Sequence, residues 1–157
     1  MSSLYDLADA LEKTPLGQSI RESTWLFPAI EATHLLALAL LGGAVILLDL
    51  RLMGVGLTGQ PVSTVERGVR PYLVWSVIAL IATGVLIGLS ETLKLYGKPA
   101  FWVKMTALAV AIVFTFGVRN PYARKDPDRG FAASAIALIS LALWLTVALA
   151  GRWIGFS

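Results

Sequence analysis

From Trp25 to Leu48 the chain reads WLFPAIEATHLLALALLGGAVILL. This stretch is apolar over nearly its whole length, and about 20 such residues are enough for a helix to cross the ~30 Å hydrocarbon core of a bilayer. Only Glu31 and His34 interrupt it with ionisable side chains, one helical turn apart, and His34 is the only histidine of the chain. The stretch therefore predicts a membrane-spanning helix that carries a polar pair.

Three further stretches have the same character. The chain has 157 residues, of which 57% are hydrophobic and 15% charged, whereas a soluble domain has about 25% charged residues. Backbone groups in lipid must be satisfied within helices, and the loops are too short for a separate soluble fold. The sequence thus predicts an all-α polytopic membrane protein, a single domain over residues 1–157. Its four-transmembrane-helix bundle has spans at about 25–48, 72–90, 100–118 and 131–150.

The segment before the first span, residues 1–23, has a different pattern. Apolar residues such as Leu4 and Leu7 repeat at helical spacing, opposite acidic residues such as Asp6 and Asp9. This pattern predicts a short amphipathic helix at the membrane interface. The segment has no basic region before an apolar core, so it is not an export signal.

Basic residues in short loops predict the orientation. The loops between the first and second spans and between the third and fourth spans hold more of them: Arg51, Arg67, Arg70, Arg119, Arg124, Lys125 and Arg129. The opposite side holds Lys13, Arg21, Lys94, Lys98 and Arg152. We therefore expect a multi-pass protein of the cell inner membrane with both termini periplasmic. The net charge of +3 follows from this loop bias, so the bilayer and not nucleic acid is the expected partner.

Two local features concern the cytoplasmic ends of the spans. Asp49 and Arg51 are interpreted as a boundary anchor of the first span. Ser63 and Glu66 have the spacing of a capping box, which predicts a short helix that ends before Pro71.

Helical projection places the polar residues of each span on one face. In the second span this face carries Ser76, Thr83 and Ser90, with Gly84 beside them. In the third span it carries Lys104, Ala111, Thr115 and Arg119. The fourth span is mainly apolar and is expected to be a packing helix.

The depths of these groups bring one set together. Glu31, His34, Glu91 and Lys104 are expected in the same half of the bundle, and ionisable groups within a membrane usually have a function. His34 is either a ligand or a packed histidine bonded to Glu31 or to a facing hydroxyl. Glu31 can orient His34, carry a proton, bind a metal or simply be neutralised, and Lys104 can instead extend to the interface.

Several motifs resemble a known family. His34 is followed by the glycine pair at 42–43, by Asp-Leu-Arg-Leu-Met-Gly at 49–54, by Thr-Gly at 83–84 and by Phe-Trp-Val-Lys at 101–104. Together they resemble an uncharacterised bacterial family of four-helix membrane proteins. More distantly, the chain is similar to copper-resistance D-type domains and to membrane haem-containing protoporphyrinogen oxidases, which share the first-helix histidine and the third-helix lysine.

This resemblance implies a cofactor inside the bundle. The relatives imply a b-type haem or copper, with His34 matching a ligand and Lys104 matching the family lysine. The chain departs from the oxidase pattern at Trp102, where that family has a second histidine. A haem would therefore need an open sixth position, another ligand such as a methionine, for which Met105 is a candidate, or a symmetric homo-oligomer.

The expected function follows from these residues. We expect a membrane protein that binds b-type haem through His34, with Glu31 and Lys104 beside it, and that exchanges electrons with a redox partner protein, as a membrane oxidoreductase does. One alternative is a copper, other metal or proton-handling site made by Glu31, His34 and Glu91. The other is a structural membrane partner whose polar stripe only specifies helix packing.

Overall fold

The computed structural model describes residues 2–156, and these are almost entirely helical. Four helical segments are long and apolar enough to span a membrane: α3 (Leu26–Leu52), α4 (Val62–Ser90), the segment Pro99–Ala123, and α8 (Phe131–Phe156). The third consists of α6 (Pro99–Phe114), the single turn η1 (Thr115–Arg119) and α7 (Asn120–Ala123). The short helices are α1 (Ser2–Glu12), α2 (Pro15–Glu22) and α5 (Thr92–Tyr96). The expectation of an all-α bundle with four candidate spans is confirmed.

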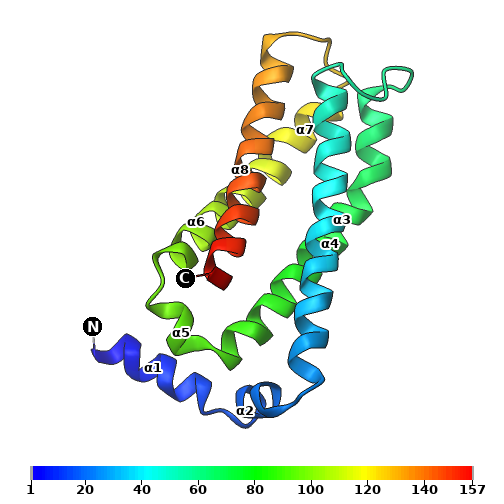
Figure 1. Ribbon diagram of the computed structural model, residues 1–157. Coiled ribbons are helices and arrows are strands. Elements are labelled where there is room, and N and C mark those ends of the chain that lie inside the picture. Colours follow the sequence, from blue (N-terminus) through cyan, green and yellow to red (C-terminus); the bar gives the residue numbers. More distant parts are fainter. Residues whose placement is uncertain (1, 157) are drawn as a thin grey trace.

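The four long segments form two pairs. Helix α3 packs along α4, α6 packs along α8, and contacts between α3 and α8 join the two pairs (Figure 1). Helices α1, α2 and α5 and the end of α8 lie at one end of the bundle, which we call the α2 end. Helix α7 and the loops that precede α4 and α8 lie at the other, the α7 end.

Packing is much tighter at the α7 end than at the α2 end. The buried residues of α3 begin only at Ala37, α6 has none before Ala111, and α8 has none after Val147. From these residues to the α7 end the helices enclose a core that includes Leu48 and Leu73. In the half of the bundle toward the α2 end, α3, α6 and α8 therefore bury few side chains between them.

The N-terminal segment forms two helices where the sequence predicted one. Thr14 caps α2, because its hydroxyl oxygen accepts a hydrogen bond from the backbone N–H of Gly17 at 3.3 Å. Pro15 occupies the first turn, where its missing N–H costs nothing. Glu12 then holds the pair of helices to the bundle, since its carboxylate accepts bonds from Arg21 at 2.6 Å and from the N–H of Leu93 at 2.9 Å.

The expected capping box before the second span is wrong. Helix α4 runs without a break from Val62 through Pro71. The backbone N–H and the hydroxyl of Ser63 both donate to Asp126, each at 2.7 Å. Because a carboxylate from another loop already satisfies this helix start, Glu66 is free to turn inward, where it is fully buried.

The same contact predicts an acid-dependent contribution to stability. The two hydrogen bonds from Ser63 hold the pKa of Asp126 below its ordinary value. A group whose pKa is lowered by folding stabilises the protein above its ordinary pKa, and this contribution is lost as the pH falls through the lowered value. We expect Asp126→Asn to have a lower thermal unfolding midpoint than wild type at neutral pH. The two midpoints should converge in acid. Asp128→Asn, in the same loop, is the control, and a difference that does not vary with pH would contradict the prediction.

The turn η1 changes the hydrogen-bond register of the third span. Pro121 has no N–H to donate, and the N–H of Asn120 bonds to the carbonyl of Thr115, five residues earlier. Such π-helical turns occur frequently at functional sites. Here the turn directs the side chains of Thr115 and Arg119 into the protein, where both are fully buried.

Candidate functional site

His34 lies on the face of α3 that packs against α4. Its Nδ1 is 2.8 Å from the hydroxyl oxygen of Thr83, and the ring is half-buried. Gly84 is next to the ring, because a Cβ added there would stand 3.5 Å from Cε1 of His34. We call His34, Thr83, Gly84 and Lys104 the His34 site.

The hydrogen bonds of Thr83 decide which ring nitrogen carries the proton. The hydroxyl of Thr83 donates to the carbonyl of Ala79 at 2.6 Å, and a hydroxyl has only one hydrogen. It therefore accepts from His34, which places the proton on Nδ1. Among the described residues Nε2 has no hydrogen-bond partner, so its lone pair is available to a metal or a proton.

Lys104 lies on α6, in the other helix pair. It projects from α6 toward α8, where a Cβ added to Gly151 would lie 3.4 Å from its Nζ. The glycine thus leaves room for the lysine side chain. The positive charge of Lys104 also acts on the ring of His34. The two predicted site residues therefore lie in the same half of the bundle, on different helix pairs.

The other predicted residues are not part of this site. Glu31 is exposed and has no hydrogen-bond or ion-pair partner among the described residues. Glu91 pairs with Lys94 at 3.1 Å. Trp102 is exposed and donates from its indole to the carbonyl of Tyr96 at 3.2 Å, and Met105 is also exposed. Within residues 2–156 no three histidine or acidic side chains are grouped as metal ligands.

A second polar site lies inside the bundle at the α7 end. Arg119 donates from Nη1 to Asp49 at 3.2 Å and to the hydroxyl of Ser140 at 3.0 Å. Its Nε donates to the side-chain oxygen of Asn120 at 3.2 Å. Glu66 lies close enough for its charge to act on Arg119. All five side chains are 0% exposed, and we call them the Asp49 cluster.

The position of Asp49 corrects the sequence interpretation. Asp49 does not anchor the end of the first span together with Arg51. Its partner is Arg119, whereas Arg51 donates to the backbone carbonyl of Gln60 at 2.6 Å. The reason is rotation: two residues along a helix is about 200°, so the two side chains leave α3 on opposite sides.

The sequence indicated only part of this cluster. The predicted inward faces of the second and third spans are confirmed, since Ser76, Thr83, Thr115 and Arg119 are buried. Ser140 was missed because the fourth span is apolar elsewhere. Trp144 could have indicated the polar face of this span, because it lies four residues after Ser140 and away from either end of the span. Its indole N–H donates to the hydroxyl of Thr115 at 3.0 Å, which marks the polar face of α8.

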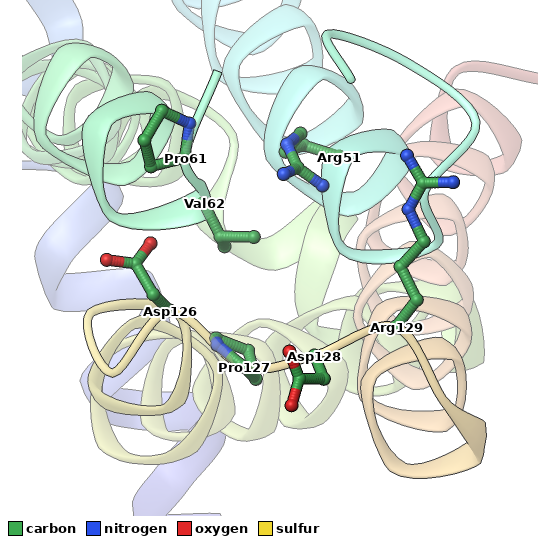
Figure 2. A pocket seen from close by; sticks show the side chains of 7 residues that line it. All are labelled: Arg51, Pro61, Val62, Asp126, Pro127, Asp128 and Arg129. Carbon is green, nitrogen blue, oxygen red and sulfur yellow. The ribbon is translucent and has the colours of Figure 1, made fainter. Parts of the chain in front are cut away.

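A surface pocket of about 290 Å³ opens at the α7 end of the bundle (Figure 2). Its lining residues are Arg51, Pro61, Val62, Asp126, Pro127, Asp128 and Arg129. They come from the end of α3, the start of α4 and the loop before α8. The side chain of Arg129 lies against Gly54, whose φ of +73° suits a residue without a side chain. The pocket is therefore walled by charged groups of both signs.

Comparison with known proteins places the chain in a family. The model described as "Family of unknown function (DUF6644)" matches residues 25–157, which is most of the chain. The chain therefore belongs to this family, in agreement with the expectation of an uncharacterised membrane family. The match does not extend to the copper-resistance D-type domains or to the protoporphyrinogen oxidases, so that resemblance stays a prediction. No curated protein and no solved structure matches the chain.

Proposed function

We propose that this member of the family is an inner-membrane protein that holds a b-type haem through Nε2 of His34. The observation that carries the proposal is the bond to Thr83, which keeps the proton on Nδ1. Histidines that bind metals almost always donate their second ring N–H to a neighbouring group in this way. Nε2 is thereby prepared as a ligand within a segment where polar groups are costly.

The surroundings of His34 fit a flat macrocycle. Gly84 has no side chain beside the ring, and α3 before Ala37 and α6 before Ala111 have no buried residues. Lys104, on the opposite helix pair, supplies a cation that can pair with a propionate carboxylate. With one histidine in the chain and Met105 exposed on α6, His34 is the side chain that would hold the haem iron.

The proposed haem would supply one-electron chemistry to a redox partner. In the proposed orientation both termini are periplasmic, so the His34 site lies in the periplasmic half and the partner approaches from that side. The alternative function, a copper site made by Glu31, His34 and Glu91, has less support. Glu31 is exposed, and Glu91 is paired with Lys94.

The test is the visible absorption spectrum of protein purified in mild detergent from cells supplied with a haem precursor. We expect wild type to show a Soret band that shifts on reduction, and His34→Ala to lose at least nine-tenths of it. Glu31→Ala is the matched control, since it removes a polar side chain one turn away that does not face the site. The control should keep the wild-type spectrum.

Two results would count against the proposal. One is a colourless wild-type protein that also fails to take up added haemin. The other is a His34→Ala variant that keeps a wild-type Soret band. Circular dichroism of each variant shows whether it remains helical, so that a lost band can be assigned to the ligand and not to unfolding.

A further inference from the structure

Four polar side-chain atoms of the Asp49 cluster are buried without a hydrogen-bond partner within the described residues. They are Asp49 Oδ2, Glu66 Oε2, Arg119 Nη2 and Asn120 Nδ2. They come from α3, α4, η1 and α7. The direct bonds of Arg119 to Asp49 and Asn120 keep three of the four side chains together, and Glu66 lies near enough for its charge to act on Arg119. Buried polar groups are nearly always satisfied in native proteins, so a cluster of four such atoms needs an explanation.

The chemistry of these atoms indicates what satisfies them. The two carboxylate oxygens are acceptors, whereas the guanidinium and amide nitrogens are donors. Water is both donor and acceptor, and buried waters in proteins typically make about three hydrogen bonds to such groups. Leaving these atoms without a partner inside a membrane bundle is costly, because lipid offers no hydrogen-bond partner. Bound water therefore fits the cluster better than an anion or a metal cation, each of which would match only half of the atoms.

The charges of the cluster leave one negative charge in excess. Asp49 and Glu66 are both 0% exposed, and Arg119 is the one fully buried cation within residues 2–156. Helix α8 contributes only the hydroxyl of Ser140. The second cation, Arg124, reaches Glu66 at 3.1 Å, but its side chain is 44% exposed and its charge is shared with solvent. A buried charge that is not fully compensated is strongly unfavourable, and adding one proton removes it.

We infer that the Asp49 cluster is a hydrated proton-binding site, in which buried water bridges the four unpartnered atoms and the two carboxylates share one added proton. The proton comes from solvent and converts one carboxylate of the pair into a carboxylic acid. This site is separate from the His34 site and does not depend on any haem.

Solvent can reach the cluster from the α7 end. Arg124 connects Glu66 directly to the surface. Val62, one helical turn before Glu66, lines the pocket of about 290 Å³ in Figure 2. The π-helical turn that carries Arg119 is the kind of local irregularity that is frequent at functional sites. The site therefore lies close to the surface at the α7 end.

Infrared spectroscopy of the full-length protein in lipid vesicles tests the inference. The pH is lowered from about 8 to about 6, which is well above the ordinary pKa of exposed carboxylates. We expect a carbonyl band of a protonated carboxylic acid to grow, corresponding to one group per chain. Carboxyl-¹³C labelling of aspartate or of glutamate assigns it without mutation, because Asp49 and Glu66 are the only fully buried acidic side chains among the described residues.

A variant pair sharpens the test. Glu66→Gln removes the excess charge and leaves Asp49 balanced by Arg119, so the band should disappear. Glu91→Gln changes an acidic residue outside the cluster and should leave the band intact. The inference is overturned if wild type shows no such band at about pH 6, or if the band survives in Glu66→Gln. Isotope labelling of wild type still decides the matter if Glu66→Gln does not fold.

Discussion

Asp49→Ala is expected to lower the free energy of unfolding by about 3–5 kcal/mol, the usual range when one partner of a buried ion pair is removed. In the variant the guanidinium of Arg119 keeps its bonds to Ser140 and Asn120, but it loses the one carboxylate to which it donates directly. Denaturant titration in detergent micelles, followed by circular dichroism, measures the change. Asp9→Ala is the control, because Asp9 pairs with the exposed Lys13 and such pairs contribute little.

A double variant separates the lost charge from the lost packing. In Asp49→Leu with Arg119→Met the ion pair is removed as a unit, so that no guanidinium is left without its carboxylate, and most of the stability should return. Two results would contradict this account. The first is an Asp49→Ala loss no larger than that of Asp9→Ala. The second is a double variant as unstable as Asp49→Ala alone.

The spans could be predicted from the sequence, but their ends at the α7 side could not. Hydropathy detects the length of helix that faces lipid. Helix α4 begins at Val62, well before the predicted start at Tyr72, because Glu66 in its added turns is buried by protein contacts and not by lipid. The same reason explains α3, which continues through Asp49 to Leu52. A polar residue that is paired inside a bundle looks, in the sequence, like the end of a span.

Which polar side chains meet was harder to predict than which helix faces they occupy. The inward faces of the second and third spans were identified correctly, with Thr83 and Thr115 buried. His34 nevertheless bonds to Thr83 and not to Glu31. An offset of about 60° on the helix is enough to leave Glu31 on the surface. The rotation of each helix depends on packing against its neighbours, which a single sequence does not specify.

The two polar sites differ in how the protein satisfies them. The Asp49 cluster lies where all four spans close, and its groups are held by direct side-chain bonds between helices. The His34 site lies where the helix pairs separate, and only α3 and α4 fix the ring. Tight packing suits a site that binds water and protons. Open packing suits a site that must admit a larger cofactor, which is consistent with the proposed haem.

Thr83→Val is expected to weaken haem binding by about 10–100-fold, the range found when the partner of a metal-bound histidine is removed. Valine keeps the branched shape but removes the hydroxyl, so Nδ1 of His34 loses its acceptor and the proton is no longer held on that nitrogen. Haemin titration of the haem-free protein in lipid nanodiscs, followed at the Soret band, gives the affinity.

Thr83→Ser is the matched control for this prediction. It retains a hydroxyl that can donate to Ala79 and accept from His34, as Thr83 does, and should bind haem within a few-fold of wild type. Equal affinities of the valine and serine variants would show that the hydroxyl does not prepare His34 as a ligand. If wild type binds haem but Thr83→Val does so equally well, His34 can still be the ligand while the tautomer argument fails. A wild type without affinity for haemin would reject the ligand role itself.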